Sequence, residues 1–71
     1  MTDALAFNIR QFRARKMLSQ EDFADLCGLH RTYVGSVERG ERNVTLSTLE
    51  SLAEAMRVSV SELLSVTSVR R

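Results

Sequence analysis

Apolar residues recur along this chain at intervals of three and four positions, the spacing of residues on one face of an α-helix. The first such stripe comprises Leu5, Ile9 and Phe12, and it predicts a helix that runs through Lys16. Proline is absent and the chain has only three glycines, so it lacks the residues that punctuate β-rich folds. The pattern therefore predicts an almost entirely helical protein.

Two short helices joined by a glycine are predicted in the middle of the chain. Ser19 caps the first of them, with Asp22 three residues later as in a capping box. Gly28 ends this helix, because glycine adopts the left-handed conformation without steric cost. The next helix is predicted over residues 30–39, with Gly40 as its C-terminal cap.

Two further helices are predicted in the last third of the chain. Thr45 caps a fourth helix, and Ser59 with Glu62 forms a second capping box that opens a short fifth helix. The apolar residues of the fourth helix lie at helical spacing: Leu49, Leu52, Ala53 and Met56. The expected fold class is all-α, a compact five-helix bundle forming a single domain over residues 1–71.

The two central helices meet several requirements of a helix-turn-helix unit at once. Ala24 is small where the two helices would cross, and Gly28 allows the tight turn between them. The inner side of the second helix is supplied by Leu29, Val34 and Val37. In such units the first helix braces against the DNA backbone and the second lies in the major groove. Residues 20–39 are therefore predicted to bind double-stranded DNA.

The formal net charge of +1 does not by itself indicate nucleic-acid binding, because the charges are unevenly distributed. One segment is acidic, with Glu21, Asp22 and Asp25. The next is basic, with Arg31, Arg39 and Arg42. The prediction of DNA binding depends on whether these arginines share a face.

Composition also disfavours several classes of protein. A single cysteine, Cys27, excludes an intrachain disulfide and a four-cysteine metal site, and it suits a reducing cytoplasm. No stretch approaches the ~20 apolar residues that cross a bilayer. One histidine, no paired carboxylates around a cleft and no phosphate-binding glycine loop argue against an enzyme. We expect no metal, cofactor, small-molecule ligand or membrane partner.

Three stretches carry a family resemblance: LSQEDFADLCGL, RTYVGSVERGERN and LSTLESLAEAMRVSVSELL. Through them, residues 9–64 resemble the XRE-like helix-turn-helix family of Cro and the phage repressors. RTYVGSVERGERNVTL is particularly similar to the controller proteins of restriction–modification systems. The resemblance implies a lambda-repressor-like DNA-binding domain and a homodimeric transcriptional regulator on a pseudo-palindromic operator. The closer similarity implies an autoregulatory controller of a restriction–modification operon.

The resemblance assigns base reading to the outward face of the second central helix. Arg31, Thr32 and Ser36 match the family's base-facing positions. An arginine can bind guanine O6 and N7 together, whereas threonine and serine can bond to bases or phosphates. A phosphate contact is the alternative for Arg31. Tyr33 is expected to lie along the DNA backbone or reach a thymine methyl, or else to pack at the edge of the domain.

Phosphate contacts are expected on both sides of this helix. Gln20 matches a family glutamine that contacts a phosphate, which suits its amide donors and the free N–H groups of a helix start. His30, at the N-cap, could contact another. The loop that follows is expected to hold phosphate through Arg39, Arg42, Asn43 and Thr45. Glu41 departs from a purely basic loop, and a solvated polar loop is the alternative.

Two further sets of residues are assigned to structure. Arg13 and Glu38 match a family ion pair that joins the first helix to the end of the third. The region of about residues 58–68 is expected to form a homodimer interface, because its apolar residues exceed what one face of a short helix needs. These residues are Val60, Leu63, Leu64 and Val66, and closure of the chain's own core is the alternative.

A second function class uses the same fold. An antitoxin or protein-interaction module would hold a protein partner on its apolar C-terminal surface. Gln20 and Arg31 together favour DNA binding over this alternative. RNA polymerase is a further expected partner if the protein activates transcription, through acidic residues such as Glu21, Asp22 and Asp25.

Overall fold

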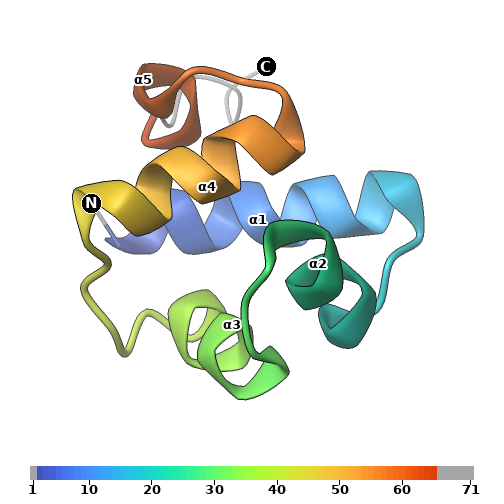
Figure 1. Cartoon of the computed structure of the whole chain (residues 1–71). Coiled ribbons are helices and arrows are strands. Elements are labelled where there is room, and N and C mark those ends of the chain that lie inside the picture. The colour runs from blue at the N-terminus through green and yellow to red at the C-terminus, as the bar shows by residue number, and fades with distance from the viewer. Residues whose placement is uncertain (1, 66–71) are drawn as a thin grey trace.

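The computed structural model describes residues 2–65, and the regular structure within that range is helical throughout (Figure 1). The all-α prediction with five helices is confirmed. No helix in this range is long and apolar enough to span a membrane. The helices are α1 (Thr2–Lys16), α2 (Gln20–Cys27), α3 (Arg31–Glu38), α4 (Leu46–Met56) and α5 (Val60–Leu63).

The long helix α1 crosses the middle of the molecule, with α2 and α3 below it and α4 and α5 above it in the view of Figure 1. It contacts α3 on one side and α5 on the other, while α2 packs on both α3 and α4. The largest fully buried side chains come from all five helices: Leu5, Ile9, Phe23, Val34, Leu52 and Leu63. One shared core therefore fixes the orientation of the short helices.

An aromatic pair lies within this core. The rings of Phe12 and Phe23 pack edge to face, with centroids 5.8 Å apart and planes at 61°. This geometry is favourable for aromatic pairs and contributes about 0.5 to 1.5 kcal/mol beyond the area buried. It joins α1 to α2, the helix that precedes the turn at Gly28.

The starts of α2, α4 and α5 are those that the sequence predicts. Ser19 and Ser59 each cap a helix within a complete capping box, the first closed by Asp22 and the second by Glu62. Thr45 caps α4 by accepting a hydrogen bond from the Thr48 amide at 3.1 Å. These caps depend on residues within three positions of each other, so local sequence suffices to predict them.

Four helices end in the same way, in a Schellman motif. Each of these helices is followed closely by a residue of positive φ. The amide of the residue after it donates a hydrogen bond to the carbonyl five positions earlier in the chain, and the donors are Leu18, Leu29, Glu41 and Val58. The positive-φ residues of α2 and α3 are Gly28 and Gly40, both at φ +72°. Those of α1 and α4 are Met17 and Arg57, for which the sequence carries no signal.

The third helix differs slightly from the prediction for residues 30–39. His30 is its N-cap and Arg39 its C-cap, so the helix is one residue shorter at each end. Gly40 lies one position beyond the cap, where its amide donates to the Val37 carbonyl at 3.0 Å. The glycine still turns the chain, because the left-handed conformation falls on it.

The prediction that Leu63 lies on a dimer surface is wrong. Leu63 is 1% exposed and belongs to the chain's own core. It is buried because α5 packs against α1 and α4. Asn8 of α1 holds the end of α5 by donating to the Leu63 and Ser65 carbonyls at 2.7 and 2.9 Å. Val60 and Leu64 are half-buried, and Val66 lies outside the described residues.

Replacement of Gly28 by alanine tests the left-handed turn between α2 and α3. A Cβ at this position meets nothing within 4 Å, so the cost comes from the positive φ alone. We expect Gly28→Ala to lower the free energy of unfolding by about 1 to 2 kcal/mol, as measured by urea denaturation. Gly28→Asn should lose less, because asparagine tolerates this conformation. Equal stability of Gly28→Ala and the parent protein would contradict the assignment.

Candidate nucleic-acid interface

The outward edge of α3 is polar at its first turn. Arg31 and Thr32 are exposed and Tyr33 is half-buried. Behind them Val34 and Val37 are buried, because the inner side of α3 packs into the core. The helix therefore presents Arg31 and Thr32 to solvent on a fixed support.

Ser36 does not share this exposed edge, and the prediction that it faces outward is wrong. Its side chain is buried, with 8% of the residue exposed. Its hydroxyl donates to the Tyr33 carbonyl at 2.7 Å and accepts a hydrogen bond from Arg42 Nε at 3.0 Å. The loop after α3 folds back far enough for Arg42 to cover this position, which helical spacing alone does not reveal.

Arg42 also lies over the ring of Tyr33, with its guanidinium carbon 5.0 Å from the ring centroid. This is a cation–π contact, and the side chain of Arg42 is shared between the ring and the Ser36 hydroxyl. Tyr33 is half-buried and also packs against the core. The contact places a cation from the loop beside the outward edge of α3.

A buried carboxylate holds α1, α2 and α3 together. Glu38 receives two hydrogen bonds from Arg13, at 2.7 and 2.9 Å, and one from Gln20 Nε2 at 3.1 Å. Arg10 donates to the backbone carbonyl of the same glutamate. Only 4% of the Glu38 side chain is exposed. The predicted ion pair of Arg13 and Glu38 is thus present and is part of a larger network.

The electrostatics of this network follow from its geometry. The hydrogen bonds to Glu38 raise the pKa of Arg13 above its ordinary value, although burial opposes them. The paired, bidentate arrangement compensates for removing the Glu38 carboxylate from water. Arg10 is a member that the sequence analysis did not identify, although it lies one helical turn before Arg13 and so faces the same neighbour.

Gln20 connects this network to the surface. It is half-buried at the first position of α2, and its amide carries a second N–H besides the one that Glu38 accepts. Gly35 of α3 lies directly beneath it: a Cβ there would be 3.4 Å from Gln20 Oε1 and 3.3 Å from Arg39 Nη1. The absent side chain of Gly35 leaves room for both polar groups over α3.

The other residues predicted to contact phosphate lie around α3. His30 is exposed at the N-cap and makes no capping hydrogen bond through its side chain. Asn43 is exposed in the loop, and the Thr45 hydroxyl caps α4. Arg39 is exposed and pairs with Glu41 through Nε and Oε2 at 3.0 Å. Gln20 and Arg39 thus lie over α3, while Thr45 lies at the start of α4 and Ser36 is covered.

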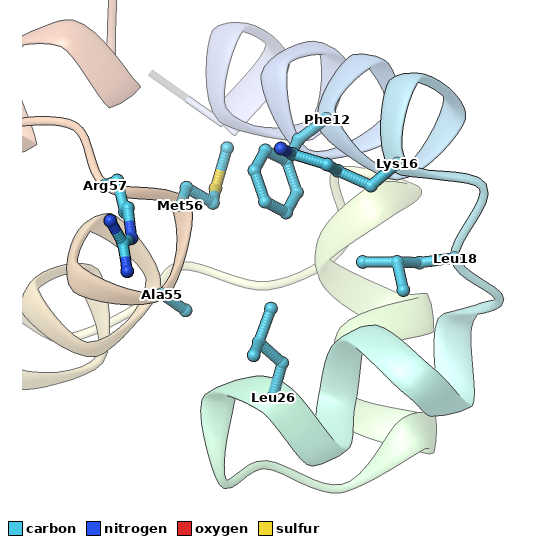
Figure 2. Close-up of a pocket in the computed structure, with 7 residues that line it drawn as sticks. All are labelled: Phe12, Lys16, Leu18, Leu26, Ala55, Met56 and Arg57. Atoms are coloured by element: carbon cyan, nitrogen blue, oxygen red, sulfur yellow. The ribbon is translucent and has the colours of Figure 1, made fainter.

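A separate hollow of about 400 Å³ lies on the flank of the bundle (Figure 2). It is lined by Phe12, Lys16, Leu18, Leu26, Ala55, Met56 and Arg57. These are apolar side chains and two cations, without the paired acid and base or the nucleophile that hydrolytic chemistry needs. The residues that line the hollow therefore give no support to a catalytic function.

The described part of the chain also offers no cluster for metal binding and no activated cysteine. Residues 2–65 contain no group of three or more histidine, cysteine, aspartate or glutamate side chains that could hold a metal ion. Burial raises the pKa of the Cys27 thiol to about 11, so the thiol stays protonated near neutral pH. Cys27 packs against the core.

The family model described as helix-turn-helix matches residues 9–63. The chain belongs to this helix-turn-helix family. The control protein C.SmaI of Serratia marcescens is 60% identical over 62 residues, which span 87% of this chain and 74% of that protein. The XRE-like resemblance and the similarity to restriction–modification controller proteins are thus confirmed.

Two solved structures show the same arrangement of helices. The hypothetical transcription factor NHTF from Neisseria has a TM-score of 0.87 and 45% identity, covering 97% of this chain and 79% of that one. The restriction–modification controller protein C.Esp1396I, solved as a tetramer in complex with its natural 35 base-pair operator, has a TM-score of 0.73 and 32% identity. That match covers 90% of this chain and 95% of the controller protein.

Truncation of Glu38 tests the buried network. We expect Glu38→Ala to lower the free energy of unfolding by about 3 kcal/mol, because Arg13 and Gln20 lose their common acceptor. Glu41→Ala is the matched control, since it removes a carboxylate whose partner Arg39 is exposed, and its urea midpoint should barely move. Equal midpoints for the two variants would rule out the assigned role of Glu38.

Proposed function

We propose that this protein is a transcriptional regulator that recognises specific sequences in double-stranded DNA, with α3 in the major groove. The observation that carries the proposal is the exposed pair of Arg31 and Thr32, at the start of a helix whose opposite side is held in the core. Helix-turn-helix units read base edges with a rigid helix that presents hydrogen-bond donors to the major groove.

Base reading falls to the first turn of α3. Arg31 can donate two hydrogen bonds to one guanine, and the hydroxyl and methyl groups of Thr32 suit a neighbouring base pair. We assign Tyr33, which is half-buried beside them, to the same surface. Ser36 serves this surface indirectly, because its hydroxyl binds the Arg42 side chain.

Phosphate contacts position this helix on the duplex. We assign them to the polar residues that surround α3: Gln20, His30, Arg39, Arg42, Asn43 and Thr45. Gln20 is suited to the role because Glu38 fixes one side of its amide while the other N–H can donate outward. Such contacts set the register of the protein on DNA and carry little sequence information.

We infer that the protein acts as a homodimer on a pseudo-palindromic operator, as a controller of a restriction–modification operon. The support is the 60% identity to C.SmaI and the operator-bound tetramer of C.Esp1396I. Half-buried Val60 and Leu64 are candidates for the subunit contact. Two-fold pairing would set the two α3 helices about 34 Å apart, one turn of DNA.

This proposal describes binding and not catalysis, and it places the protein in the cytoplasm, where it can reach DNA. A contact with RNA polymerase stays a prediction. Glu21, Asp22 and Asp25 are exposed on α2 and offer an acidic surface for it.

Two arginine variants test the assignment of base and phosphate contacts. A tight-binding duplex is first selected from a random pool, and affinities for it and for a scrambled duplex are measured against salt concentration. We expect Arg31→Ala to lose about 1 to 3 kcal/mol on the selected duplex and much less on the scrambled one.

Arg42→Ala is the comparison, because it removes a predicted phosphate contact. It should weaken binding to both duplexes alike and reduce the salt slope by about one. Equal losses on both duplexes for Arg31→Ala would reject base reading by this residue. Failure of the parent protein to select any duplex would reject the proposed function.

A further inference from the structure

One residue in the proposed phosphate-binding loop has the wrong charge for that role. Glu41 carries an exposed carboxylate between Arg39 and Arg42, and it forms an ion pair with Arg39 at 3.0 Å. The side chains of both partners are more than half exposed, at 59% for Arg39 and 57% for Glu41. The pair is therefore accessible from solvent, unlike the buried pair of Arg13 and Glu38.

The backbone holds Glu41 in this place. Its amide donates to the Ser36 carbonyl at 3.0 Å, the bond that closes the Schellman motif of α3. In the motifs of α1, α2 and α4 the corresponding residues are Leu18, Leu29 and Val58, which pack against the core. At α3 this position carries a charged side chain beside Arg39 in place of an apolar contact.

Arg39 itself lies beside Gln20 on the proposed phosphate surface. Its Nη1 reaches back over Gly35, where the amide of Gln20 also lies. Gln20 and Arg39 therefore converge on one patch, formed by the start of α2 and the end of α3. A phosphate that Gln20 binds would lie within reach of the Arg39 guanidinium.

A carboxylate and a phosphate compete for the same donors of an arginine. Both are anionic oxygen acceptors, and both form charge-assisted hydrogen bonds with a guanidinium. While Arg39 Nε donates to Glu41, that N–H cannot also donate to DNA. The pairing lowers the pKa of Glu41 and raises that of Arg39, so both groups are charged at neutral pH.

We propose that Glu41 is an internal counter-ion that occupies Arg39 in place of a DNA phosphate and so lowers the affinity of this protein for any duplex. The proposal rests on the proposed function, since it concerns the same surface. A phosphate bound through Arg39 Nε must then displace the carboxylate. Because phosphates are the same in every sequence, Glu41 sets the affinity and leaves the ratio of specific to non-specific binding unchanged.

The experiment compares Glu41→Gln with a charge-matched control, Glu54→Gln, whose residue is exposed on α4 across α1 from α3 (Figure 1). We expect Glu41→Gln to bind the selected and the scrambled duplex about 2 to 5 times more tightly at low salt, the range for an exposed pair. The gain should shrink as salt rises. Glu54→Gln should gain less on both duplexes.

The variant Arg39→Gln distinguishes release of Arg39 by the loss of Glu41 from direct repulsion between Glu41 and DNA. In the Arg39→Gln background, Glu41→Gln should no longer raise the affinity, because the donor that it releases is absent. The same gain in both backgrounds would show that Glu41 repels DNA directly, and no gain in either would also overturn the proposal.

A second readout does not depend on DNA. The Nε–H signal of Arg39 is followed by NMR while inorganic phosphate is added to the parent protein and to Glu41→Gln. We expect the signal to shift at about 2- to 5-fold lower phosphate concentration in the variant. The same concentration dependence in both proteins would refute the counter-ion role, even if the protein bound no duplex.

Discussion

The position of α3 depends on the buried carboxylate of Glu38. A charge removed from water is tolerated only when it is fully paired and hydrogen-bonded, and this one is bound by Arg13 of α1 and Gln20 of α2. Three helices therefore meet at one side chain. Any large displacement of α3 would leave the Arg13 guanidinium and the Gln20 amide without their shared acceptor.

This constraint explains how so short a helix can present a binding surface. An isolated helix of eight residues is not stable in water, so α3 owes its structure to packing. Val34 and Val37 fix its inner side and Glu38 fixes its end. Arg31 and Thr32 then project from a support that is organised before DNA arrives, which reduces the entropy lost on binding.

The sequence predicts the features that depend on neighbouring residues. Caps such as Ser19 and glycine turns such as Gly28 require only a few adjacent positions, and the buried stripes follow from helical spacing. The prediction for Ser36 failed because its exposure depends on Arg42, a side chain from the following loop. The left-handed conformation of Met17 was not predicted, since a long side chain gives no sign of it.

Native-state hydrogen exchange tests the claim that the Glu38 network makes α3 part of the same cooperative unit as α1. If the network holds, the central amides of α3 should exchange with the same opening free energy as those of α1 around Ile9, because α3 cannot open while its end stays locked. An opening free energy for α3 lower than that of α1 by about 2 kcal/mol or more would contradict the account. It would show that α3 opens on its own and that Glu38 does not fix it.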